Sequence, residues 1–245
     1  TVPFVSKATG NPLAKCAALI ATGKKISELR DSKHLPASGD GKANGVSVKE
    51  AVLPWNRFRR VDGKGVDAVL GPEMKSTGEV MGIDQNFPIA YAKSQTAAFG
   101  ALPKSGAVFI SLSDRDKSDG AASAKQLSQL GFAIYSTKGT HDFLASKGIS
   151  SYLVRKNSEG VGENPTSNQL ILDGKVSLVI NTPLGRGAKQ DGWLIRTAAV
   201  TKGIPCITTI AGFKAAVAAI GEMKNREFAV KPLQDWIKSE GKQIA

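Results

Sequence analysis

Short apolar, β-branched runs alternate with amphipathic stretches along the second half of the chain. The apolar runs are residues 107–112, 132–135, 152–154, 176–180 and 204–207. Apolar residues three or four positions apart, the spacing of helices, recur at residues 117–130, 140–147, 191–202 and 210–221. This alternation predicts an α/β domain, a five-stranded parallel sheet with helices on both faces. Sheets of this kind bind ligands at the carboxyl ends of their strands.

The first hundred residues show a less regular pattern. Helical spacing is found at residues 13–23 and 87–99, and strand patterns at 48–53 and 78–83. Residues 100–106, Gly-Ala-Leu-Pro-Lys-Ser-Gly, have the composition of a linker. We therefore expect two regions, residues 1–100 and 101–245. Within the second, the charged tail 222–245 is expected to form a solvated surface helix.

Composition favours an ordinary globular protein. The chain has 245 residues, of which 41% are hydrophobic, enough to bury a core. No run approaches the roughly 20 apolar residues that span a bilayer, and the first residues do not resemble a secretion signal. Cys16 and Cys206 lie far apart and suggest no disulfide framework, so we expect a reducing, cytoplasmic location.

The formal charge of +12 raises the question of nucleic-acid binding. The excess of Lys and Arg is spread over both halves of the chain. Its densest cluster, at residues 57–64, has no ladder of aromatic residues on which bases could stack. The sequence therefore favours a small anionic ligand or an acidic partner surface, and neither a nucleic acid nor a membrane.

Hydroxyl, amide and cationic residues follow four of the predicted strands. They are Ser111, Ser113 and Lys117, then residues 136–140, then Arg155 and Lys156, then residues 181–186. Hydroxyls and backbone amides at helix N-termini, with lysine as a point charge, are the groups that hold phosphate. The alternative for each position is an ordinary helix cap or a solvated lysine. Because four strand ends agree, we predict a phosphate pocket.

Three motifs carry a family resemblance. They are residues 1–10 (TVPFVSKATG), 47–58 (SVKEAVLPWNRF) and 71–82 (GPEMKSTGEVMG). Together they resemble the end of the second ATP-grasp unit of the carbamoyl phosphate synthase large chain. Residues 104 to about 221 resemble that chain's C-terminal methylglyoxal-synthase-like regulatory domain. The resemblance implies such a domain preceded by an incomplete ATP-grasp lobe, and Thr1 in place of a start methionine suggests a piece of a longer protein.

The resemblance implies two effector sites. A nucleotide monophosphate, uridine monophosphate as inhibitor or inosine monophosphate as activator, would contact Ser111, Lys117, Thr137, Thr140, Lys156, Asn181 and Thr182. Pro183 departs from the family pattern, which has a hydroxyl residue there. Glu50, Leu53 and Thr208 match positions of an ornithine site, although a plain surface charge is the alternative for Glu50. The sequence does not say which nucleotide acts.

The parent enzyme implied by the resemblance makes carbamoyl phosphate for pyrimidine and arginine biosynthesis. It uses bicarbonate, ATP with Mg²⁺ or Mn²⁺, and ammonia from a glutamine amidotransferase small chain. In the family the metal-binding Glu and Asn precede the TVPFVSK motif, so we expect this chain alone to be non-catalytic, with no metal and no cofactor of its own.

Two alternatives belong to other functional classes. A methylglyoxal synthase would need a carboxylate base near the phosphate pocket, and Gly162-Glu163 would align only roughly with it. That enzyme's histidine would fall near residues 189–192, whereas the chain's histidines are His34 and His141. The other alternative is an interaction module that binds no small ligand.

Overall fold

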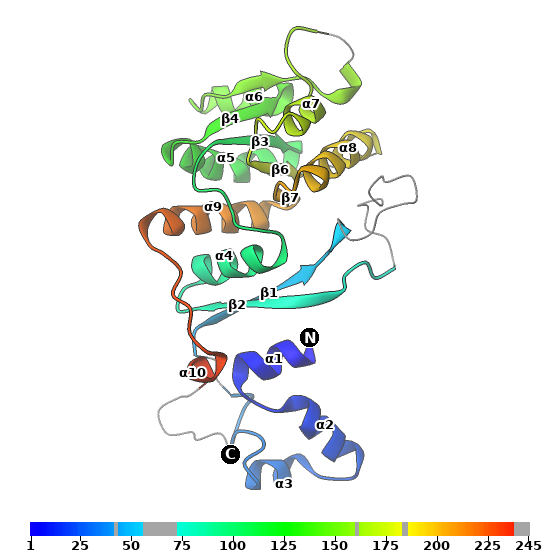
Figure 1. Cartoon of the computed structure of the whole chain (residues 1–245), viewed down its shortest axis with the longest axis vertical. Coiled ribbons are helices and arrows are strands. Elements are labelled where there is room, and N and C mark those ends of the chain that lie inside the picture. The colour runs from blue at the N-terminus through cyan, green and yellow to red at the C-terminus, as the bar shows by residue number, and fades with distance from the viewer. Residues whose placement is uncertain (42–43, 56–72, 160–161, 183–185, 238–245) are drawn as a thin grey trace.

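The molecule is elongated, with a parallel sheet at one end and short helices at the other (Figure 1). The structure is a computed structural model, which describes residues 1–41, 44–55, 73–159, 162–182 and 186–237. Between the two ends lie a pair of strands and one helix. The residues for which the sequence predicts phosphate contacts lie at the sheet end.

The sheet at this end has five parallel strands in the order β5-β4-β3-β6-β7, as the sequence predicts. The strands are β3 (Ala107–Leu112), β4 (Ala133–Thr137), β5 (Tyr152–Val154), β6 (Leu178–Thr182) and β7 (Cys206–Ile207). β4 and β6 each end two residues later than predicted, because polar residues continue both strands beyond the apolar run. The polar residues at their ends therefore belong to the sheet itself.

Helices cover both faces of the sheet, and each face has its own apolar cluster. The helices are α5 (Asp114–Gln129), α6 (Lys138–Ser146), α7 (Ser167–Leu172), α8 (Arg186–Lys202) and α9 (Ile210–Asn225), and η2 (Asn157–Glu159) is a short 3-10 turn. Val108 and Ile110 face α5, α6 and α9, whereas Phe109 and Val179 face α7 and α8. α7 was not predicted, since its apolar run Leu170–Leu172 is too short to show a period.

Among the described residues, the first region begins with three short helices, which are followed along the long axis by a pair of strands and a fourth helix. Its elements are α1 (Val2–Thr9), α2 (Leu13–Ala21), α3 (Ile26–Asp31), β1 (Val46–Val52), β2 (Gly78–Asp84) and α4 (Phe87–Ala98). β1 and β2 pair antiparallel, and α4 packs on them. α4 begins where the Asn86 side chain accepts a hydrogen bond from Ile89 N at 3.0 Å, with Pro88 in its first turn.

α4 also packs against α9 of the sheet-bearing region. Ile89, Ala92 and Leu102 belong to the same buried cluster as Phe213 and Ile220 of α9. Apolar contact therefore continues across the segment that the sequence marks as a linker. The division into residues 1–100 and 101–245 stays a prediction.

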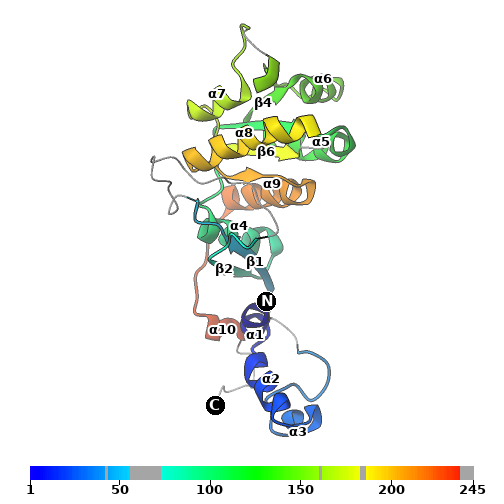
Figure 2. The ribbon, with the colours of Figure 1, turned by 90° about the vertical axis from the view of Figure 1, so that its right-hand side faces the viewer.

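The segment after α9 returns to the first region. Figure 2 shows it passing α4 and the β1–β2 pair and reaching α10 (Leu233–Ile237) beside α1. Trp236 of α10 is only 6% exposed, and the ammonium groups of Lys93 and Lys231 lie 5.7 and 3.6 Å from the centre of its ring. α10 is thus a short surface helix that the buried indole anchors. Residues 226–232 are not helical and residues 238–245 lie outside the described residues, so the expected helix over the tail is confirmed only in part.

Candidate functional site

Three polar side chains form a row across the carboxyl ends of β4, β3 and β6. Ser111 is paired in register with Asn181, and Ile110 with Ser136, so Ser111 lies beside Thr137. Paired positions on neighbouring strands point to the same face of a sheet. Ser111 Oγ and Thr137 Oγ1 are 3.2 Å apart. The row lies on the face that α7 and α8 cover, next to Phe109 and Val179.

Asn181 is the residue of this row with unused hydrogen-bonding capacity. Its side chain is 3% exposed, and its Nδ2 makes no hydrogen bond within the part of the chain that the structure describes. A buried amide donor without a partner costs free energy, about 1–3 kcal/mol in proteins. A ligand oxygen beside Ser111 and Thr137 would remove that cost.

Thr140 and Thr182 are brought to the same place but have structural contacts. The Thr140 Oγ1 atom accepts a hydrogen bond from Leu112 N at 3.0 Å, and the Thr182 Oγ1 atom accepts one from Ser113 N at 3.2 Å. Both side chains are almost fully buried. These bonds fix the turn that joins β3 to α5. The Thr182 hydroxyl also donates to the carboxylate of Asp116, which helps to lower the pKa of that acid.

Lys117 reaches from α5 to the first turn of α6. An ideal Cβ at Gly139 would lie 3.2 Å from the Lys117 Nζ atom, so the ammonium group lies close against the backbone there. The side chain is 16% exposed, and Nζ pairs with Asp114 Oδ1 at 2.6 Å. The first turn of a helix also presents unpaired amides to an anion. Lys117 and these amides therefore offer positive charge at one place.

Lys156 is exposed and directly follows β5 and Arg155. Its backbone amide donates to Glu159 Oε2 at 3.1 Å. The hydrogen bond and charge of Lys117, and then the charge of Lys156, hold the pKa of Asp114 below its ordinary value. Asp114 therefore lies within the fields of both lysines for which the sequence predicts a phosphate contact.

The sequence reasoning missed the acidic residues of this place. Asp114 and Asp116 occupy the first turn of α5, where acidic residues are common for reasons of helix stability alone. Ser113 Oγ donates to Asp116 Oδ2 at 2.7 Å, and this bond lowers the pKa of Asp116. Pro183 and the basic cluster at residues 57–64 lie outside the described residues.

A cavity of about 810 Å³ lies apart from the strand-end row, between the first region and the sheet. Glu50, Leu53 and Thr208, the predicted ornithine-site residues, all line it. Gln95 of α4 donates to Glu50 Oε2 at 2.7 Å, which fixes the carboxylate. The structure thus brings together three residues that lie up to 158 positions apart in the sequence (208 minus 50).

Further residues of the cavity had no signal in the sequence. The rings of Trp55, Tyr91 and Phe99 line the cavity, and Arg196 of α8 brings a positive charge to it. Burial, and then the charge of Glu50, raise the pKa of Tyr91 to about 12, so its hydroxyl remains protonated. Burial likewise raises the pKa of the Cys206 thiol to about 12, against the opposing effect of Arg196. Both cysteines are free thiols.

Neither a metal site nor a membrane span is found in the described ranges. No three His, Cys, Asp or Glu side chains there are grouped to hold a metal ion. None of the helices described is long and apolar enough to cross a bilayer. His141 Nδ1 lies 2.9 Å from Ser151 Oγ, and Glu163 is exposed.

Comparison with known proteins agrees with this architecture. Residues 119–208 match the MGS-like domain family. Carbamoyl phosphate synthase large chains of Streptomyces avermitilis, Pseudarthrobacter chlorophenolicus and Clavibacter sepedonicus are 51%, 53% and 52% identical to this chain, over 96% of its length. This chain belongs with the carbamoyl phosphate synthase large chains. The predicted family and the MGS-like fold are therefore confirmed. The chain spans 22% of the length of those relatives.

Proposed function

We propose that this chain is the allosteric region of a glutamine-dependent carbamoyl phosphate synthase large chain and binds a nucleotide monophosphate at its strand ends. The observation that carries the proposal is the row of Ser111, Thr137 and Asn181, flanked by Lys117 and Lys156. The buried amide of Asn181 has no partner among the residues that the structure describes. Hydroxyl, amide and ammonium donors in one place suit a phosphate monoester. Uridine and inosine monophosphates are the candidate effectors.

Each residue of the pocket has a distinct task in this proposal. Lys117 and the first turn of α6 bind the phosphate, and Lys156 adds a second charge at the mouth. Asn181 and one hydroxyl of the Ser111–Thr137 pair donate to phosphate or ribose oxygens, since the other hydroxyl donates within the pair. Thr140 and Thr182 hold the β3–α5 turn around the ligand.

The activity of the whole enzyme belongs to the same proposal. The parent would be an ATP-dependent ligase of the cytoplasm that needs Mg²⁺ or Mn²⁺ and takes ammonia from a glutamine amidotransferase small chain. Its product would serve pyrimidine and arginine biosynthesis. The first region of this chain would be the remnant of the second ATP-grasp unit, and the chain alone would not catalyse the reaction.

The contact of α4 with α9 supports a route for regulation. α9 packs on the sheet through Phe213 and Ile220, and α4 packs on both α9 and the β1–β2 pair. A nucleotide that favours one arrangement of the sheet would thereby bias the first region. Such couplings amount to about 1–3 kcal/mol and act equally in both directions, so ATP would change nucleotide affinity by the same factor.

The cavity supports a second effector. Glu50, held by Gln95, would bind the terminal ammonium group of ornithine, and Thr208 would bind a polar group at its other end. Because the cavity is lined from both regions, an amino acid there would contact β1, α4 and β7 together.

Calorimetry with uridine and inosine monophosphates tests the proposed nucleotide site. We expect binding by this chain, weakened by about 1.5–3 kcal/mol in the Lys156→Ala variant, the range for hydrogen bonds to charged groups. Lys175→Ala is the control, since Lys175 is also exposed but precedes β6, at the opposite end of the strand. Absence of binding, or an equal loss in both variants, would reject the site. Conversion of dihydroxyacetone phosphate would instead support a methylglyoxal synthase.

A further inference from the structure

The carboxylate of Asp114 occupies a position that an anionic ligand would need. Asp114 Oδ1 lies 2.6 Å from Lys117 Nζ, and that ammonium group lies against the start of α6 at Gly139. The charge of Lys156 acts on the same carboxylate. Asp114 therefore already pairs with Lys117, the cation on which the proposed phosphate site depends.

Asp114 and Lys117 differ in solvent exposure, and this difference decides which side chain can leave the ion pair. The Lys117 side chain is 16% exposed, whereas that of Asp114 is 95% exposed. Asp114 can rotate into solvent and be hydrated there, while Lys117 stays beside α6. The buried amide of Asn181, beside Ser111 at the strand ends, is a donor without a partner among the described residues.

We propose that Asp114 is an internal ligand of Lys117 that closes the anion pocket in the free protein, and that a phosphate-bearing effector binds by displacing it. This inference rests on the proposed effector site. The ion pair of the closed form is replaced by an ion pair with the ligand, and Asp114 moves into water. The binding-competent form is then only a fraction of the free protein, and the apparent dissociation constant is the intrinsic one divided by that fraction.

This arrangement has a signature that separates displacement from simple repulsion. The fraction of open pocket depends on the protein alone, so its effect is the same factor for every ligand that needs Lys117. Electrostatic repulsion between Asp114 and a ligand instead grows with ligand charge. A phosphate monoester carries about two negative charges near neutral pH, whereas its methyl ester carries one.

The experiment compares Asp114→Asn with the matched control Asp119→Asn, using uridine 5′-monophosphate and its phosphate methyl ester as probes. Asp119 is another exposed acid of α5, and it pairs with Lys214 Nζ of α9 at 3.1 Å, so its removal changes net charge equally and frees no cation of the proposed site. We expect Asp114→Asn to tighten binding of both probes by the same factor, about three- to fivefold for an exposed pair. Asp119→Asn should leave both affinities within twofold.

A Lys117→Ala background completes the test. There Asp114 has lost the ammonium group with which it pairs, so Asp114→Asn should no longer tighten binding, a non-additivity that reports direct interaction. A gain confined to the doubly charged probe, or one that persists without Lys117, would overturn the displacement model in favour of repulsion. If the unaltered chain binds uridine monophosphate but Asp114→Asn equals the control, this inference alone fails. If the unaltered chain binds neither probe, the effector site itself fails.

Discussion

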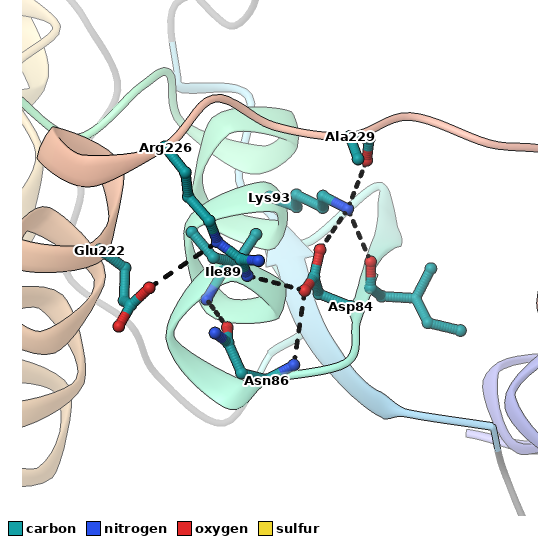
Figure 3. A network of polar contacts seen from close by, with 8 residues as sticks. Asp84, Asn86, Ile89, Lys93, Glu222, Arg226 and Ala229 are labelled. Carbon is teal, nitrogen blue, oxygen red and sulfur yellow. Dashed lines mark hydrogen bonds and ion pairs between the residues drawn. The ribbon is translucent and has the colours of Figure 1, made fainter.

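Asp84 and Arg226 lie 142 positions apart in the sequence, and an ion pair of 3.0 Å joins them (Figure 3). Lys93 of α4 donates to the other carboxylate oxygen at 2.9 Å and to the backbone carbonyl of Ala229 at 2.7 Å. Both Arg226 and Lys93 therefore pair with Asp84, the last residue of β2. The network ties the segment after α9 to the first region and brings α10 to its place beside α1.

We expect the two ends of this network to differ in their effect on stability. The Asp84 side chain is 8% exposed and Lys93 15%, so Asp84→Ala leaves a nearly buried ammonium without its counter-charge. Loss of one partner from a buried pair costs about 3 kcal/mol. Arg226 is 44% exposed, so Arg226→Ala should cost at most about 1 kcal/mol. Urea unfolding measures both, and equal losses would contradict this ranking.

The same carboxylate makes stability depend on pH. Burial acts to raise the pKa of Asp84, but hydrogen bonds from Lys93 and Asn86, with the charges of Lys93 and Arg226, hold it below its ordinary value of 3.8. A folded pKa below the unfolded one means that ionised Asp84 stabilises the fold at higher pH. That contribution starts to be lost near 3.8 and disappears as pH falls through the folded pKa.

Asp84→Asn removes this titration while it keeps the shape of the side chain. We expect the unfolding free energy of the unaltered chain to fall more steeply than that of the variant below about pH 4. Urea unfolding at several pH values between 3 and 6 measures the difference. Parallel curves for the two chains would mean that the pKa of Asp84 is not lowered by folding.

The parallel sheet was predictable because each strand carries its own signal. β3 and β5 have the predicted bounds, since β-branched runs such as Val108–Ile110 lie between polar or glycine-containing stretches. α1, α3 and α7 were not predicted. α1 has no buried residue, and α3 and α7 are six residues long, so none carries a clear apolar period.

The strand-end site was predictable in its donors and not in its acids. Once β3 and β6 are neighbours in the sheet, the register of the parallel pair brings Ser111 beside Asn181. The pairing of Asp114 with Lys117 depends on side-chain rotamers, and the approach of Lys117 to Gly139 on how α5 lies relative to α6. The pattern of a single sequence reveals neither side-chain rotamers nor the placement of one helix relative to another. The Asp84–Arg226 ion pair was not predicted for a similar reason, because its two residues belong to elements that share no sequence motif.

At Gly82 the backbones of β2 and α4 lie close together. An ideal Cβ there would lie 2.0 Å from the carbonyl oxygen of Ala90 and 2.6 Å from the amide nitrogen of Ser94. Both are helix backbone atoms, which cannot turn aside as a side chain can. We expect Gly82→Ala to destabilise the first region by about 3 kcal/mol, the upper part of the range for overpacking.

Gly78→Ala in the same strand is the matched control, because nothing lies within 4 Å of an ideal Cβ at that position. Thermal unfolding followed by circular dichroism compares the two variants. We expect a clear fall in melting temperature for Gly82→Ala and little change for Gly78→Ala. Similar melting temperatures would show that α4 does not pack on β2 as closely as the structure has it.

The cavity makes a prediction about ornithine that depends on one charge. Glu50 is held by Gln95 at 2.7 Å, so Glu50→Gln keeps a polar side chain of the same size but removes the negative charge. If the carboxylate binds the ornithine ammonium group, the affinity of the variant for ornithine should fall about tenfold or more, since hydrogen bonds to charged groups contribute about 1.5–3 kcal/mol.

Calorimetry measures this affinity, with Glu73→Gln as the control, because Glu73 is an exposed acid paired with Lys75. Uridine monophosphate affinity should stay unchanged in both variants, because none of the predicted nucleotide contacts lines the cavity. Equal ornithine affinity in the unaltered chain and Glu50→Gln would remove Glu50 from the site.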